Sequence, residues 1–277
     1  MRKKLLFYPA ILLILVWTLA PIYWALRTSL LQESDLKSTP IKYFPNPIST
    51  KNYQHLLGFA DNTSVWQSFS KALMNSLITC LLATVIVVVI SILSGYAFAR
   101  LKFHGQNILF YMVLITMALP AYAVIIPLYK IMVDLGLVDT QTGITLVYVS
   151  AFVPLSIWLM RNYFKTIPKE LDEAAMMDGA SKLRALWTIL PLSLPGVITA
   201  AILTFLNAWS QFLIPLVFSP AKTKPLTVLI TEFNGRYTME YGMITAAGII
   251  TMIPSILIVL FLNRYLVNGL MTAAVKD

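Results

Sequence analysis

Six stretches of the chain are continuously apolar and long enough to cross a lipid bilayer. About 20 residues of α-helix, at about 1.5 Å rise per residue, cover the hydrocarbon core. Backbone polar groups in lipid must bind each other, so each span is expected to be a helix; barrel strands would alternate instead. The sequence therefore predicts an all-α membrane protein in which residues 1–277 form a single transmembrane domain with six transmembrane helices. The predicted spans are Leu5–Leu26, Ala72–Phe98, Ile108–Met132, Gly143–Met160, Pro191–Val217 and Met243–Leu266.

Prolines within these stretches predict kinks or breaks, which neighbouring helices can accommodate. They are Pro120, Pro127, Pro154, Pro195 and Pro254.

The first apolar stretch follows a basic start, and a cleaved signal peptide is the alternative interpretation. Cleavage after Ala20 would leave Pro21 directly behind the cut, which disfavours signal peptidase. We therefore expect an uncleaved first span.

The basic residues predict the orientation of the spans. With six spans, both termini share a side with loops 99–107 and 161–190, and this side carries 12 of the 21 Lys and Arg residues. Since cytoplasmic loops are enriched in Lys and Arg, both termini and loop 161–190 are predicted to be cytoplasmic. Segments 27–71 and 218–242 are then external loops.

The composition narrows the function classes. Hydrophobic residues make up 58% of the chain and charged residues 12%, with a mean hydropathy of +0.76. A soluble domain carries about 25% charged residues. The net charge is +9, but the basic residues lie between the apolar stretches and do not form a single patch. This argues against nucleic acid as a partner. The lone Cys80 and the distant His55 and His104 predict neither a disulfide nor a metal site.

The predicted cytoplasmic loop 161–190 has the most specific sequence. Pro168 suits the first position of a helix, and Glu170, Asp172 and Glu173 favour its first turns through the helix dipole. Gly179 is typical of a helix-ending turn. Ser181 can cap a second short helix that stops before Pro191. The sequence predicts a short helix, a tight turn and another short helix.

One face of the first short helix carries two small residues, which would let the backbone of another protein come close. Leu171, Ala174, Ala175 and Asp178 follow the spacing i, i+3, i+4, i+7 of one helical face. An ordinary interfacial helix between two spans explains this amphipathicity as well, but not the full pattern around it.

That pattern combines Glu173-Ala174-Ala175, Asp178-Gly179-Ala180, Ile189-Leu190-Pro191 and Pro195-Gly196. It resembles the EAA loop of ABC importer permeases. The resemblance implies the type I ABC importer permease fold and a cytoplasmic coupling helix that docks on an ATPase subunit. The docking residues would be Glu173, Ala174, Ala175, Asp178, Gly179 and Ala180.

Other segments narrow the resemblance to carbohydrate permeases of the maltose type. They are Asn75-Ser76, Gly95–Arg100, Pro127–Tyr129, Trp209–Pro215 and Gly269–Asp277. Where such permeases often carry Trp-Asn-Glu-Phe, this chain has Trp209-Ser210-Gln211-Phe212, so a role that needs a carboxylate there is in doubt.

The resemblance implies partners and further sites. A second permease, two ATP-binding subunits and an extracytoplasmic sugar-binding protein would join this chain in a bacterial or archaeal cytoplasmic membrane, with lipid around the spans. The chain itself would hold no cofactor, and ATP and Mg would sit on the ATPase subunits. Candidate contacts are Asn234, Gly235, Arg236 and Tyr237 for the binding protein, and Val275, Lys276 and Asp277 for the ATPase.

Polar groups inside spans usually face protein or water, so Asn207, Trp209 and Gln211 are candidates to line the transport pathway. Hydrogen bonding between helices is the alternative for these three, as a solvated turn is for Asn234–Tyr237.

The chain has no Gly-rich Lys-Ser/Thr phosphate loop and no pairing of a nucleophile with a base, so a non-catalytic transport subunit is predicted. The alternatives are a secondary transporter and a membrane-embedded enzyme. A secondary transporter needs buried ionisable residues to couple ion flow, and the predicted spans are nearly free of them. A membrane-embedded enzyme needs a cluster of such residues, and none appears.

Overall fold

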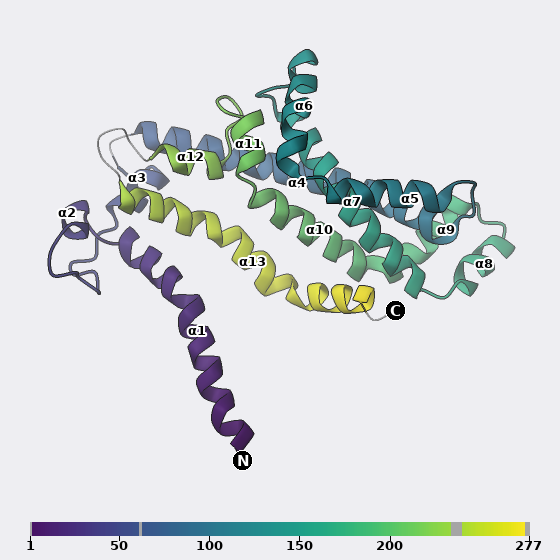
Figure 1. The fold of residues 1–277 in the computed structure, drawn as a ribbon, viewed down its shortest axis with the longest axis horizontal. Coiled ribbons are helices and arrows are strands. Elements are labelled where there is room, and N and C mark those ends of the chain that lie inside the picture. The colour runs from purple at the N-terminus through teal and green to yellow at the C-terminus, as the bar shows by residue number, and fades with distance from the viewer. Residues whose placement is uncertain (1, 61–62, 234–239, 275–277) are drawn as a thin grey trace. The chain divides into compact units, whose positions relative to one another are not determined.

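The computed structural model describes residues 2–60, 63–233 and 240–274 of the chain. Over these residues the fold is helical and has no strand, which confirms the predicted all-α class (Figure 1). The longer elements are α1 (Arg2–Ser29), α4 (Thr63–Arg100), α5 (Gln106–Ile115), α6 (Ala121–Asp134), α7 (Gln141–Thr166), α10 (Leu194–Trp209) and α13 (Tyr241–Ala274). The shorter ones are α2 (Glu33–Leu36), α3 (Lys51–Leu57), η1 (Thr116–Ala118), α8 (Glu170–Met177), α9 (Lys182–Ile189), η2 (Leu190–Ser193), α11 (Leu213–Phe218) and α12 (Leu226–Glu232).

Five helices in the described part of the chain are long and apolar enough to cross a membrane, and the count is up to six if α5 and α6 form one span. Two predicted spans are not continuous helices. The stretch 108–132 divides into α5 and α6, which are bent by 104°. Leu119 is extended, with ψ 132°, because the ring of Pro120 disfavours the helical conformation of the residue before it.

The stretch 191–217 also divides. Helix α10 ends at Trp209 and α11 begins at Leu213. Pro215 has no N–H to donate to the carbonyl of residue 211, and its ring clashes with that carbonyl in a continuous helix. The break therefore follows from the sequence Gln211–Pro215.

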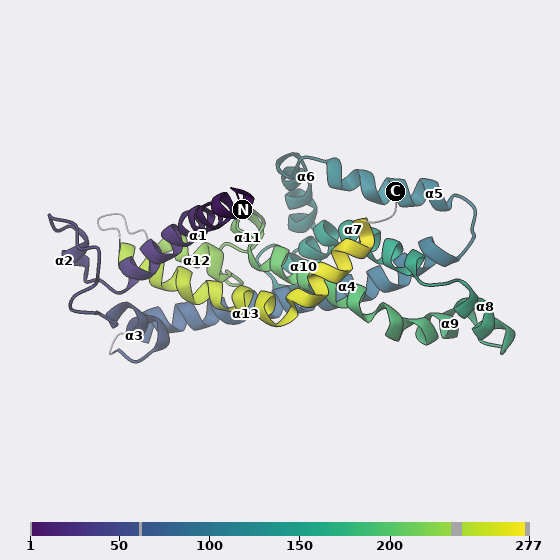
Figure 2. The same cartoon turned by 90° about the horizontal axis from the view of Figure 1, so that it is seen from below.

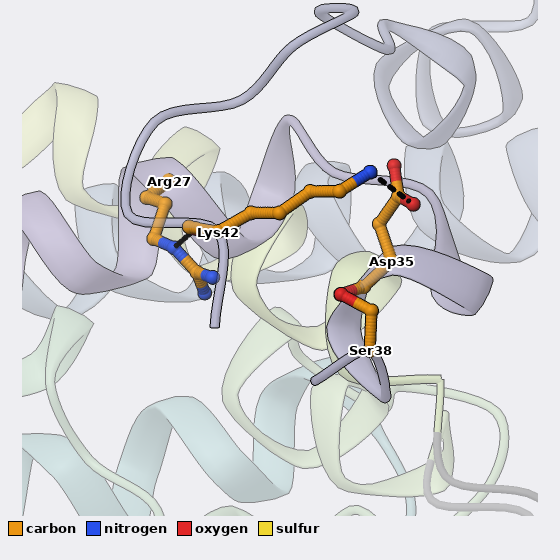
Figure 3. A network of polar contacts seen from close by, with 4 residues as sticks. All are labelled: Arg27, Asp35, Ser38 and Lys42. Carbon is orange, nitrogen blue, oxygen red and sulfur yellow. Dashed lines mark hydrogen bonds and ion pairs between the residues drawn. The ribbon is translucent and has the colours of Figure 1, made fainter. Parts of the chain in front are cut away.

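The chain forms two compact units. One comprises residues 1–73 and 226–254, and the other comprises 74–225 and 255–277. In the first unit, the segment after α1 is held by polar contacts (Figure 3). Arg27 Nε donates to the carbonyl of Lys42 at 2.6 Å, and Lys42 Nζ lies 2.7 Å from Asp35 Oδ1. Ser29 and Asn52 join the end of α1 to α3, since Asn52 Nδ2 donates to the Ser29 carbonyl at 3.1 Å.

The second unit carries the candidate site, and its core joins α4, α7, α9 and α10. The buried members are Tyr96, Leu159, Met160, Phe164, Ile167, Leu186, Ile189 and Ala200. Helices α4 and α7 approach closely at Gly95, where an added Cβ would lie 2.7 Å from Met160 Cβ. Helices α7 and α10 do the same at Gly196, beside the ring of Tyr163. Small residues allow such approaches because they leave room for the neighbouring helix.

We predict that Gly95→Ala lowers the melting temperature of the purified protein, because neither Met160 Cβ nor the nearby backbone nitrogen of Arg161 can move cheaply. Overpacking of this kind costs about 1–3 kcal/mol. Gly248→Ala in α13 is the control, since its Cβ would meet nothing within 4 Å and Ala is the better helix former. Equal melting temperatures for the two variants would contradict the close approach of α4 and α7.

Candidate coupling site between α7 and α10

The loop between α7 and α10 folds as the sequence predicts, into a short helix, a turn and a second short helix. Figures 1 and 2 show α8 and α9 side by side at one end of their unit. The three acidic residues lie in the first turn of α8. Helix α8 begins two residues after Pro168, with Lys169 as its N-cap. Pro168 therefore lies before the helix and not, as the sequence had predicted, in its first position.

The turn after α8 is a Schellman motif, in which a left-handed residue lets two amides turn back to the helix carbonyls. Gly179 has φ +84°. Its N–H donates to the carbonyl of Met176 at 3.0 Å, and the N–H of Ala180 donates to that of Ala175 at 3.0 Å. Ser181 then caps α9 by accepting from the N–H of Arg184 at 3.3 Å. The turn therefore fixes the angle between α8 and α9.

The predicted docking face of α8 is accessible. Leu171, Glu173, Ala174, Asp178 and Gly179 are exposed. Ala175 and Ala180 are half-buried.

Met177, next to the turn, is 88% exposed. Sequence reasoning did not select it, because a single exposed apolar side chain is normal and carries no signal by itself. The structure shows that Leu171 and Met176 of the same helix are also exposed.

A buried ion pair joins α8 to the end of α4. Arg100 Nε lies 2.9 Å from Asp172 Oδ2, and the two side chains are only 4% and 6% exposed. The Nε–H direction does not meet hydrogen-bond geometry, so this contact is electrostatic. Tyr96 OH donates to Asp172 Oδ1 at 3.5 Å, and Arg100 Nη2 donates to the carbonyl of Ile167. Arg100 thus contacts α8 through Asp172 and also contacts Ile167, the residue directly after α7.

Burial and neighbouring charges shift the pKa of Asp172. Burial raises the pKa of its carboxyl above the usual value, while the Arg100 charge and the Tyr96 hydroxyl act in the opposite direction and Glu173 adds to the rise. Since burial disfavours the charged form, the neighbouring guanidinium is the main favourable interaction of this carboxylate. Sequence reasoning used Asp172 only for the helix dipole, and 72 positions separate it from Arg100, so no local pattern connects them.

Comparison with known proteins identifies this architecture. Residues 87–271 match the family described as "Binding-protein-dependent transport system inner membrane component". The chain belongs to this family. The resemblance to carbohydrate ABC importer permeases that the sequence predicted is confirmed.

Similar proteins cover nearly the whole chain. The sulfoquinovosyl glycerol transport system permease protein SmoH of Agrobacterium fabrum is 35% identical and covers 99% of this chain and 94% of its own. The trehalose/maltose transport system permease protein MalG of Thermococcus litoralis is 33% identical, with 100% and 98% covered. A chain in a crystal structure of a bacterial ABC transporter involved in the import of the acidic polysaccharide alginate matches with a TM-score of 0.79 and 25% identity, covering 96% of this chain and 98% of that chain.

The three predicted pathway residues of this permease lie at the end of α10 and in the break that follows it. Asn207 Nδ2 donates to the carbonyl of Leu203 in its own helix at 2.7 Å, and Asn207 lines a cavity of about 10 Å³. Trp209 is buried and stacks on Phe205, with ring centroids 5.6 Å apart. Gln211 lies in the break between α10 and α11, where a broken span exposes backbone groups to polar partners.

The other predicted contacts, Asn234–Tyr237 and Val275–Asp277, lie outside the described residues. Among the residues that are described, no group of three or more His, Cys, Asp or Glu side chains is placed to hold a metal ion.

An anchor that sequence reasoning missed lies between α6 and α7. Asp139 has a left-handed backbone, with φ 57°. Its carboxylate accepts from the backbone N–H groups of Ala221, Lys222 and Thr223 at 2.8–3.2 Å. Burial raises the pKa of Asp139, but these hydrogen bonds outweigh it and bring the pKa below its usual value. Asp139 therefore fixes the segment after α11 to the α6–α7 loop.

We predict that Asp172→Asn destabilises the α8–α9 loop, because it leaves the Arg100 charge buried without a counter-charge. Breaking a buried pair costs about 3–5 kcal/mol, whereas replacing both partners with apolar residues is close to neutral. The double variant Arg100→Met/Asp172→Leu should therefore recover most of the loss. Glu173→Gln, at the exposed neighbouring carboxylate, is the matched control.

Trypsin cleavage at Lys169, Lys182 and Arg184 in detergent measures this loss. Cleavage should be faster in Asp172→Asn than in the double variant or the control. If Asp172→Asn and Glu173→Gln were cleaved at the same rate, the ion pair would not hold the loop.

Proposed function

We propose that this permease is one of two transmembrane subunits of an ABC importer for a carbohydrate and that the α8–α9 loop couples it to an ATPase. The second permease, two ATP-binding subunits and an extracytoplasmic sugar-binding protein complete the assembly. ATP and Mg belong to the ATP-binding subunits. The observation that carries the proposal is the accessible small-residue face of α8, held to the transmembrane helices by a buried ion pair.

The face of α8 suits a docking role. Ala174 and Ala175 let a partner backbone come close, and Met177 offers a flexible apolar side chain that adapts to a partner groove. Glu173 and Asp178 add exposed carboxylates at the edge of this face. A short rigid helix with small residues at its centre is suited to insertion into a groove on another protein.

The ion pair can transmit a movement of α8 to α4. If the ATPase subunits displace α8, Arg100 moves with it, since separating the pair would leave two buried charges unpaired. Arg100 is the last residue of α4, so the displacement acts on a helix of 38 residues. The core residues Leu186 and Ile189 of α9 tie the same loop to α7 and α10. ATP-driven closure would open the pathway outward, and hydrolysis would return it inward.

The loop is proposed to lie on the cytoplasmic side together with both termini, in agreement with the Lys and Arg asymmetry. The Asn234–Tyr237 segment, on the other side, remains our candidate for the binding-protein contact, and Val275–Asp277 for a contact with the ATPase. Asn207, Trp209 and Gln211 remain candidates to line the pathway. The broken helix at Ser210–Phe212 favours this, because interrupted helices in transporters face a cavity or protein.

A carbohydrate is the proposed substrate class. The relatives are named as permeases for trehalose/maltose and for sulfoquinovosyl glycerol, and the similar structure is that of a transporter involved in alginate import.

We predict that Gly179→Val uncouples ATP hydrolysis from uptake while the protein stays in the membrane. A β-branched residue at φ +84° is strained by roughly 1–2 kcal/mol, which depopulates the docking turn about tenfold. Gly179→Asn is the matched control, because Asn tolerates the left-handed region and nothing lies within 4 Å of an added Cβ. Substrate uptake per ATP hydrolysed, measured in proteoliposomes, should fall for Val and stay near wild type for Asn. Equal ratios for Val, Asn and wild type would refute coupling through this turn.

Affinity purification from native membranes in mild detergent tests the assembly itself. We expect an ATPase subunit and a second six-span permease to copurify, and the ATPase activity to rise when a sugar-binding protein is added with its carbohydrate. Recovery of the chain alone, moving solute without ATP, would favour a secondary transporter.

A further inference from the structure

A cavity of about 210 Å³ lies between the end of α4 and the two short helices of the loop. Its volume is several times the roughly 30 Å³ that one water occupies. The charged residues that line it are Arg100, Lys102, Lys169, Lys182, Asp172 and Glu173. Four are basic and two are acidic, so the lining has a formal charge of +2 and favours an anion.

Arg100 provides a buried donor in this lining. Its Nε faces Asp172 and its Nη2 donates to Ile167, but its Nη1 has no hydrogen-bond partner among the described residues. The side chain is only 4% exposed. A buried charged N–H without a partner is costly. A rotation of the guanidinium that brings Nη1 to a ligand oxygen in the cavity would remove that cost.

Each basic residue of the lining lies at or near the end of a candidate span. Arg100 ends the span Ser64–Arg100, and Lys102 follows it by two residues. Lys169 follows the end of Gln141–Thr166 by three residues, and Lys182 begins Lys182–Trp209. Lys and Arg at the ends of spans reach the headgroup region, where lipid phosphates lie.

We propose that this cavity binds a phosphate group, supplied by the headgroup of a singly charged anionic phospholipid. The three exposed lysines draw in the phosphodiester, and Arg100 Nη1 donates to one of its oxygens. Asp172 is already compensated by Arg100, so its charge does not prevent binding. Basic pockets between transmembrane helices are suited to such headgroups. Assignment to the cytoplasmic leaflet rests on the proposed function; the binding itself does not.

Lipid retention tests the site in the purified permease, together with any subunits that copurify with it. This preparation is placed in nanodiscs of phosphatidylcholine with increasing phosphatidylglycerol, and native mass spectrometry counts the phosphatidylglycerol that remains bound. The test variant is Lys102→Gln/Lys169→Gln/Lys182→Gln, which leaves the Arg100–Asp172 pair intact. Lys165→Gln is the control. Lys165 is exposed near the end of α7, four residues before Lys169, and it does not line the cavity.

The triple variant should bind phosphatidylglycerol about a hundredfold more weakly, at about fivefold per lysine, while Lys165→Gln stays near wild type. If inorganic phosphate at millimolar concentration displaces the lipid from the wild type, the cavity also takes free phosphate; if it does not, the lipid is the sole source. Either result supports a phosphate site. Equal retention by the triple variant and the control would overturn it, and this outcome is independent of whether an ATPase copurifies.

Discussion

The ion pair between Arg100 and Asp172 is the constraint on which the position of the α8–α9 loop in this permease depends. Both side chains are almost fully buried, so neither charge can lose its partner without a large cost. Helix α8 is only eight residues long and could not hold a fixed position by its own propensity. The pair, with Tyr96 and the Ile167 carbonyl, gives this short helix a position relative to α4.

The Schellman turn complements that constraint. Gly179 and Ala180 turn back onto the carbonyls of Met176 and Ala175, which sets the course of the chain into α9. Leu186 and Ile189 of α9 are then buried in the core of α4, α7 and α10. The loop is thus anchored electrostatically through α8 and by apolar packing through α9. Its exposed tip lies between these two anchors.

Both interruptions described above lie beside a proline, whereas Pro127, Pro154 and Pro254 lie inside continuous helices. Pro120 separates α5 from α6, and Pro215 separates α10 from α11. Near the second break, Asp139 binds three backbone N–H groups after α11 and gives the interrupted segment a fixed attachment. Broken helices and a firm attachment are compatible with a pathway whose lining changes during transport while the surrounding helices stay intact.

The sequence by itself determined the helical class, the apolar stretches and the local form of the α8–α9 loop. Those features depend on nearest neighbours along the chain: apolar length, the proline ring, the left-handed preference of glycine and the capping serine. Only the tertiary structure decided that Asp172 faces inward to Arg100 while Glu173 stays exposed. These outcomes depend on contacts between distant segments, because burial changes the cost of a charge in ways that no local pattern records.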